Sequence, residues 1–221
     1  MITPFAFANS IQHNTESWNI AQFIGNFSQD KKVKYFIQPF ISFIDRENKF
    51  HTASLFLGVG YQLNDDLLVW LMNGETATIQ GNGNELNINT IRQELDWHTW
   101  RTNPNNFYDT AFASITRLEE RKNQAPGAWQ IRFRQKGIFR TPIKGWQGHS
   151  FVTSDEIFLD FTHPQWINSN SFLQQNQAFV GMGTVVSRNI AFDFGYLNQY
   201  LWNNTKHMNS IASLIVYVNI D

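Results

Sequence analysis

The sequence has no cysteine, little charge and no long apolar run, and each absence excludes a class of protein. Without cysteine the chain forms no disulfide and no thiolate metal site, which suits an extracytoplasmic bacterial protein. Charged residues make up only 16%, and the formal net charge of -1 argues against nucleic acid as a main partner. The longest apolar run, Leu67–Met72, is far shorter than the roughly 18 residues of a membrane-spanning helix. A helical membrane protein is therefore excluded.

Aromatic and amide side chains are abundant instead. Aromatics reach 15%, with 20 Phe and 8 Trp, while 24 Asn and 16 Gln supply much of the polarity. The mean hydropathy is therefore still negative, at -0.35. So much aromatic and aliphatic surface would collapse in water, which excludes a disordered chain. The 221 residues are enough for one domain or two small ones.

Apolar and polar residues alternate with a period of two along most of the chain, which predicts β-strands. No stretch holds a helical period for long. In the segment Phe50–Leu63, for example, one face is apolar and the other is small or polar. The apolar face carries Ala53, Leu55, Leu57, Val59 and Tyr61.

Eleven such segments follow one another, separated by turn-forming residues and without a linker or a low-complexity tract. We therefore expect one all-β domain over residues 9–221. The predicted strands are Ser17–Phe27, Val33–Ile44, Phe50–Leu63, Leu67–Thr78, Asn89–Arg101, Phe107–Arg121, Ala128–Arg140, His149–Phe161, Ser171–Ser187, Ile190–Asn203 and His207–Ile220.

The faces of these strands favour a closed antiparallel up-and-down transmembrane β-barrel. Their apolar faces are long enough for the roughly 9–11 tilted residues of a spanning strand, and aromatic residues lie near strand ends, where interfacial girdles form. A soluble β-sandwich or a lipocalin-like binding protein, with the apolar faces turned inward, stays open as an alternative. The aromatic residues expected near strand ends are Tyr35, Trp70, Trp97, Trp100, Tyr108, Trp129, Trp146, Trp166, Tyr196, Tyr200 and Trp202.

The number of strands is limited by parity, because single-chain bacterial barrels use an even number. Eleven segments are one fewer than a barrel of twelve strands needs and one more than a barrel of ten needs. If residues 9–16 add a poorly patterned first strand, the barrel has twelve strands, which is our prediction. If one segment is misassigned, it has ten.

Twelve charged residues on the polar faces of neighbouring strands are candidates for lining the lumen of such a barrel. Adjacent antiparallel strands would pair opposite charges across a wet lumen, and charged rings of this kind set selectivity in channels. Alternatively, the pairs neutralise one another and fill the interior. The candidate residues are Arg92, Glu94, Asp96, Arg117, Glu119, Arg121, Arg132, Arg134, Lys136, Arg140, Glu156 and Asp160.

Catalytic and metal-binding patterns are not visible in the sequence. No two of the six histidines lie at i, i+2 on one strand or at i, i+4 on a helix, so no local metal site is expected. His149 and Ser150 are adjacent and would face opposite sides of a strand, so they form no catalytic pair. We expect no enzyme activity, no cofactor and no metal. An outer-membrane enzyme stays open as the last alternative, because the catalytic residues of a barrel converge from distant strands.

Short strand-and-turn phrases from about Trp18 onward resemble an uncharacterised family of bacterial outer-membrane β-barrels, known only as a domain of unknown function. The resemblance implies the porin-like superfamily and the outer membrane of a Gram-negative bacterium, and it implies no activity. The phrases are Leu57-Gly58-Val59-Gly60-Tyr61-Gln62-Leu63, Ile115-Thr116-Arg117-Leu118-Glu119-Glu120-Arg121, Ile131-Arg132-Phe133-Arg134, Asp155-Glu156-Ile157-Phe158 and Phe194-Gly195-Tyr196-Leu197-Asn198-Gln199.

The favoured function is a small porin-like channel for hydrophilic solutes, with a charged lumen. Its expected partners are outer-membrane lipid, the barrel-assembly machinery and the solutes themselves. The alternative within the membrane is a filled barrel with a structural or adhesive role through the loops at residues 80–88 and 162–170. At the start of the chain, residues 1–8 end in Ala6-Phe7-Ala8, which has the small-x-small form of a signal-peptidase site and predicts a signal-peptide remnant.

Overall fold

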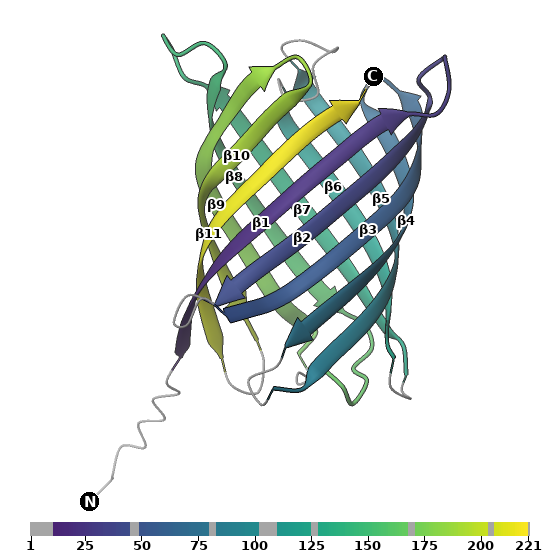
Figure 1. Ribbon diagram of the computed structural model, residues 1–221, viewed down its shortest axis with the longest axis vertical. Coiled ribbons are helices and arrows are strands. Elements are labelled where there is room, and N and C mark those ends of the chain that lie inside the picture. The colour runs from purple at the N-terminus through teal and green to yellow at the C-terminus, as the bar shows by residue number, and fades with distance from the viewer. Residues whose placement is uncertain are drawn as a thin grey trace, which may run out of the picture.

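Eleven β-strands make up the described part of the chain in the computed structural model (Figure 1). The structure describes residues 11–44, 49–79, 83–101, 110–124, 128–167, 171–202 and 206–220, with the backbone alone at 100, 101, 110 and 111. Within these ranges no helix is long and apolar enough to cross a membrane. The strands are β1 (Gln12–Asn26), β2 (Val33–Ile44), β3 (Lys49–Asn64), β4 (Leu67–Ile79), β5 (Glu85–Arg101), β6 (Thr110–Asn123), β7 (Gln130–Pro142), β8 (His149–Asp160), β9 (Leu173–Ser187), β10 (Ile190–Leu201) and β11 (His207–Ile220).

The strands form one closed barrel. Each strand pairs antiparallel with its neighbours in sequence, and the barrel closes where β1 pairs in parallel with β11, from Gln12↔His207 to Gly25↔Ile220. The two arrows point the same way in Figure 1. We call the end where β1 begins the N end and the end where β11 finishes the C end.

The prediction of twelve strands, and the alternative of ten, are corrected by this closure: eleven strands close the barrel within the described residues. Residues 12–16, which were expected to belong to a separate first strand, instead extend β1 toward the N end. An odd number makes the first and last strands run in the same direction, and a parallel ladder satisfies their backbone groups. Parity therefore does not limit the count. The predicted signal remnant at residues 1–8 lies outside the described residues.

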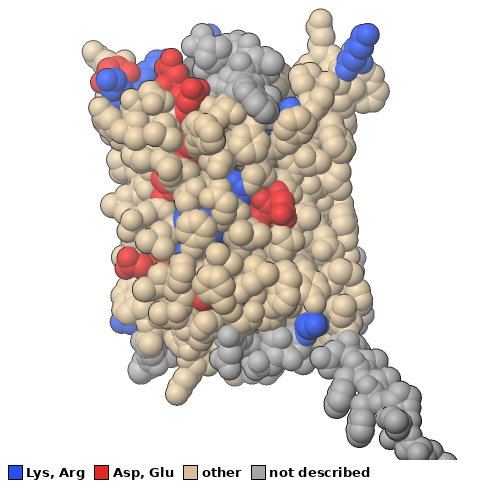
Figure 2. Space-filling view, turned by 180° about the vertical axis from the view of Figure 1, so that it is seen from behind, with Lys and Arg blue, Asp and Glu red and all other residues tan. Residues whose placement is uncertain are grey.

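The side chains alternate between the lumen and the outside because successive residues of a strand point to opposite faces. On β3 the apolar face points outward, with Leu57 51% exposed and Val59 53% exposed. Large apolar residues on the other strands are exposed in the same way, and Figure 2 shows that uncharged residues cover most of the wall. The closed barrel excludes the β-sandwich alternative.

Exposed aromatic residues lie near both ends of the barrel. At the C end they are Phe27, Tyr61, Trp97, Phe139, Trp146 and Phe151, and at the N end they are Phe50, Trp129, Phe161 and Phe172.

Two members of the predicted aromatic set lie elsewhere. Trp70 points into the lumen and is buried, and Tyr196 is exposed in the middle of β10, where its hydroxyl contacts Ser210. Trp70 lies within an apolar run that has no polar face, so the sequence carries no signal for its direction. The side chains of Trp100 and Tyr108 lie outside the described set.

Apolar side chains fill part of the lumen. One cluster toward the C end contains Phe36, Phe56, Trp70 and Met72, and the ring of Phe36 packs on that of Trp70 with centroids 5.5 Å apart. A Cβ atom at Gly60 would overlap the Trp70 indole, so glycine is required there for the ring to lie against the wall. Across the barrel Val152, Phe179, Leu197 and Ile211 form a second cluster.

The parallel closure predicts a specific cross-link. Ser17 of β1 lies opposite Ala212 of β11, on the outward face, and the chain has no cysteine of its own. We expect the double variant Ser17→Cys/Ala212→Cys to form a disulfide under mild oxidation, because neighbouring strands bring Cα atoms to about 5 Å, within disulfide range. The measurement is the mobility of the boiled, non-reduced protein. The control pairs Ser17→Cys with Ser114→Cys on β6, and equal cross-linking in both would contradict the closure.

Candidate functional site

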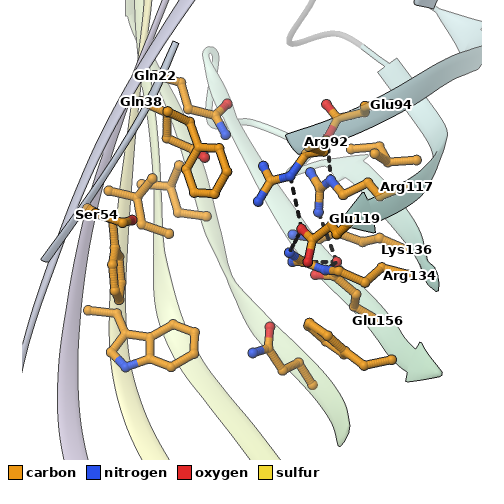
Figure 3. A pocket seen from close by; sticks show the side chains of 18 of the residues that line it. Gln22, Gln38, Ser54, Arg92, Glu94, Arg117, Glu119, Arg134, Lys136 and Glu156 are labelled. Carbon is orange, nitrogen blue, oxygen red and sulfur yellow. Dashed lines mark hydrogen bonds and ion pairs between the residues drawn. The ribbon is translucent and has the colours of Figure 1, made fainter. Parts of the chain in front are cut away.

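The barrel encloses a cavity of about 500 Å³ with two unlike walls. Figure 3 shows charged side chains of β5–β8 on one side and amide, hydroxyl and aromatic side chains of β1–β3 on the other. We call these the charged wall and the neutral wall, although the neutral wall includes one carboxylate, that of Glu16 on β1. Because inward and outward residues alternate on each strand, every second residue of these strands reaches the cavity.

The register of β5–β8 places opposite charges side by side on the charged wall. Arg92 lies opposite Glu119 across β5 and β6, and Glu94 lies opposite Arg117. Across β7 and β8, Lys136 lies opposite Glu156 and Arg132 lies opposite Asp160. The strand pairing itself therefore brings acids and bases together.

Three arginines and three glutamates of the charged wall form one alternating chain. Arg92 pairs with Glu119 at 3.0 Å, Glu119 with Arg134 at 2.7 Å, and Arg134 with Glu156 at 2.8 Å. Glu156 also pairs with Arg117 at 2.8 Å, and Arg117 pairs in turn with Glu94. All six side chains are at most 15% exposed. The chain is neutral as a whole and lies across the middle of the lumen.

Toward the N end, a second group of polar residues ties β6, β7 and β8 together. Arg132 donates to Asp160 at 2.8 Å, and Gln130 donates to the other oxygen of that carboxylate at 2.6 Å. Arg121 donates to Gln130 at 2.6 Å. These contacts leave the Asp160 carboxylate fully buried.

Toward the C end, Arg140 forms an ion pair with Asp193 of β10. The same carboxylate accepts a hydrogen bond from the Tyr217 hydroxyl of β11 at 2.9 Å. This group connects the charged wall to the far side of the barrel.

The neutral wall alternates aromatic and amide side chains. Along β2, Gln38 lies between Phe36 and Phe40, and all three line the cavity. Phe40 packs edge-on against Trp18 of β1, with ring centroids 5.5 Å apart. An aromatic pair therefore lies on each side of the Gln38 amide.

Comparison with family models matches residues 15–210 of this chain to the family described as "Protein of unknown function (DUF2490)". The chain belongs to this family. The match includes every residue of the charged wall, so the alternating ion pairs lie within the part of the chain that defines this DUF2490 barrel.

The chain was also compared with curated proteins and with solved structures. No curated protein matches the DUF2490 barrel. Among solved structures, the siderophore receptor PirA from Pseudomonas aeruginosa is similar, with a TM-score of 0.33 and 13% identity over 80% of this chain and 33% of the receptor. The chain therefore spans about a third of the length of that receptor.

Eleven of the twelve predicted lumen residues line the cavity of the DUF2490 barrel. The exception is Asp160, which points inward but is covered by Gln130 and Arg132. Two inward carboxylates, Glu16 of β1 and Asp193 of β10, were not among the candidates. Each is the single acid on its strand face. The alternation of the residues around it is the sequence signal that could have identified its inward direction.

Several polar groups facing the cavity keep unused hydrogen-bonding capacity. Lys136 makes no ion pair with any described residue. Arg92 donates a hydrogen bond to Glu119 through its Nε atom alone. On the neutral wall, Gln22 and Gln38 have no side-chain partner among the described residues and point into the cavity (Figure 3). The oxygen Oδ1 of buried Asp96 also lacks a donor there.

Two histidines, His51 of β3 and His98 of β5, line the cavity. Among the described residues no group of three potential metal-ligating side chains occurs. The ring of His149, near the C end, contacts the Thr184 hydroxyl at 3.0 Å, on the neighbouring strand.

Proposed function

We propose that this chain is an outer-membrane β-barrel whose charged lumen passes small hydrophilic solutes. The observation that carries the proposal is the polarity of the wall, which is ion-paired and polar around a cavity of about 500 Å³ and apolar on the outside. Transmembrane barrels have this arrangement, with a polar interior and an apolar band between aromatic girdles.

The outer surface supports the membrane part of the proposal. In water, so large a continuous apolar exterior would drive aggregation. Some of the polar side chains on it are paired across strands: Thr116 donates to Gln135 at 2.8 Å, and Asn176 donates to Asp155 at 2.7 Å. Pairing of this kind is what polar groups need in hydrocarbon, where no water satisfies them.

The size of the lumen supports the passage of small solutes. Barrels of eight strands are filled by side chains, and those of about sixteen hold open channels. With eleven strands and a cavity among its side chains, this barrel lies between the two. Only small solutes fit such a lumen.

A filled barrel with a structural or adhesive role is the second candidate. The apolar cluster of Phe36, Phe56, Trp70 and Met72 inside the lumen favours it, because these side chains narrow the path toward the C end. The predicted loop at 80–88 offers less surface than expected, since Glu85 and the residues after it belong to β5.

The test begins with native cells and ends with conductance. We expect the chain in the outer-membrane fraction, with a gel mobility that changes on boiling. The purified protein should form small channels in a planar bilayer. Arg134→Ala removes a cation shared by Glu119 and Glu156 and should shift ion preference toward cations. The control is Arg188→Ala, in the exposed turn between β9 and β10.

Recovery in a soluble fraction would contradict the membrane assignment. A membrane barrel that conducts no current would instead favour the filled barrel. An Arg134→Ala channel with unchanged ion preference would show that the charged wall does not face the conducting path.

A further inference from the structure

The cavity carries a feature that a simple solute path does not require: unused cationic groups face a wall of aromatic rings. We propose that the cavity binds small aromatic carboxylates, with the carboxylate held by Arg92 and Lys136 and the ring against the neutral wall. The inference rests on the proposed function only in that the cavity must be reachable from water.

An ammonium group without an ion pair on the charged wall favours an anion. The alternating chain contains three arginines and three glutamates, and Lys136 adds a fourth cation that is paired with none of the described carboxylates. Lys136 lies opposite Glu156 in register, but Arg117 and Arg134 already share that carboxylate. Lys136 lines the cavity, and its ammonium group has no ion-paired carboxylate among the described residues.

Arg92, which lines the same cavity, supplies fixed hydrogen-bond donors. Its Nε atom binds Glu119 at 3.0 Å, and the guanidinium lies over the Phe56 ring, 3.9 Å from the centroid. These two contacts orient the side chain and leave both terminal nitrogens without an acceptor among the described residues. In Figure 3 the guanidinium points into the cavity, toward the neutral wall. A planar guanidinium held in this way is suited to a carboxylate.

The neutral wall is suited to the rest of such a ligand. Trp18 and Phe40 form one aromatic pair, Phe36 and Trp70 form another, and both line the cavity. A ligand ring would pack edge-on or offset against them, as aromatic pairs do. The Gln38 amide between the pairs offers a hydrogen bond to a ring substituent. The cavity volume lies within the roughly 300–1,000 Å³ of small-molecule sites.

Two further carboxylates face the same cavity, Glu16 and Asp96. Glu16 accepts hydrogen bonds from Trp18 at 2.7 Å and Asn209 at 3.0 Å. Asp96 accepts one from Trp70 at 3.1 Å and keeps its other oxygen without a donor. A ligand cation at Asp96 is therefore the competing occupant.

The experiment titrates the purified full chain in lipid nanodiscs with three matched fluorinated probes and follows the fluorine NMR line width. The probes are para-fluorobenzoate, para-fluorobenzylammonium and para-fluorobenzyl alcohol. We expect the benzoate to bind most tightly. Lys136→Gln and Arg92→Gln should each weaken its binding roughly tenfold, the value of one charge-assisted hydrogen bond. Lys136→Arg should retain binding, and Arg188→Gln, in the exposed turn, is the control.

Tighter binding of the benzylammonium, equal binding of all three probes, or no response to either glutamine variant would overturn the inference. Lys136 has no ion pair to lose among the described residues, so Lys136→Gln should fold normally, which the unfolding midpoint checks. A barrel that binds the benzoate but carries no current would refute the proposed channel and support this inference. A conducting barrel that binds none of the probes would support the proposed channel and refute this inference.

Discussion

Replacing Leu57 with arginine should lower the free energy of unfolding in lipid vesicles by about 2–4 kcal/mol, the cost of a cation at the midplane of a transmembrane barrel. Leu57 lies at the middle of β3 with 51% of its surface exposed, inside the apolar band. Urea titration of the vesicle-bound protein, followed by the mobility of unboiled samples, measures the change. The effect is expected to be large because, in the proposed membrane barrel, hydrocarbon surrounds this exposed residue.

The matched control lies on the same strand and the same face. Leu63 is 50% exposed, close to the C end of β3, where arginine in a membrane barrel costs about 0–1 kcal/mol. A water-soluble barrel would tolerate both substitutions within about 0.5 kcal/mol, as exposed surface positions do. Equal, small effects at Leu57 and Leu63 would therefore refute the membrane assignment, whereas a depth-dependent difference would support it.

Removing the carboxylate of Glu119 should lower the free energy of unfolding by more than the Leu57 substitution does. Glu119 is 2% exposed and pairs with Arg92 at 3.0 Å and with Arg134 at 2.7 Å. Glu119→Ala leaves both arginines short of a partner in a buried position, and breaking a buried pair in this way costs about 3–5 kcal/mol. Urea unfolding of the vesicle-bound barrel measures the loss.

Two further variants separate pairing from packing. Glu85→Ala, at the exposed start of β5, should leave stability nearly unchanged. Arg92→Met/Glu119→Leu removes the charges together and should cost less than Glu119→Ala alone, because hydrophobic replacement of a buried pair is often tolerated. A loss well below 1 kcal/mol in Glu119→Ala would mean that lumen water solvates the arginines and would contradict a buried, water-excluded ion pair.

Leu57 lies on the outer face of the barrel and Glu119 on the lumen face, so the two stability losses together distinguish the environments of the two faces. A large loss at Leu57 with a small loss at Glu119 would describe a membrane barrel with a water-filled lumen. Large losses at both would describe a membrane barrel whose charged wall is a rigid part of the interior. In that case a solute meets Lys136 and the terminal nitrogens of Arg92.

The strands and their faces were predictable where apolar and polar residues alternate. The segments predicted for β2 and β11 coincide with the observed strands, and Arg132 and Arg134 point inward as the pattern of their strand requires. The prediction was wrong for Trp70, where apolar and polar residues do not alternate. In Leu67–Met72 both faces are apolar, so the inward direction of Trp70 was not readable.

The pairing partners within the lumen were partly predictable. That β5–β8 would bring opposite charges together followed from antiparallel order alone. Which arginine meets which carboxylate depends on the register, because a shift of one residue reverses the faces of a whole strand. Contacts across the barrel, such as Arg140 with Asp193, depend also on how the strands tilt and close.

The sequence by itself determined that the chain is all-β, where its strands lie and which residues share a face, because a period of two is a local property of the chain. Only the tertiary structure decided that eleven strands close through a parallel β1–β11 pair and that aromatic rings of β1–β4 face the charges of β5–β8. Both depend on hydrogen bonds and packing between residues far apart in sequence, for which local alternation carries no information.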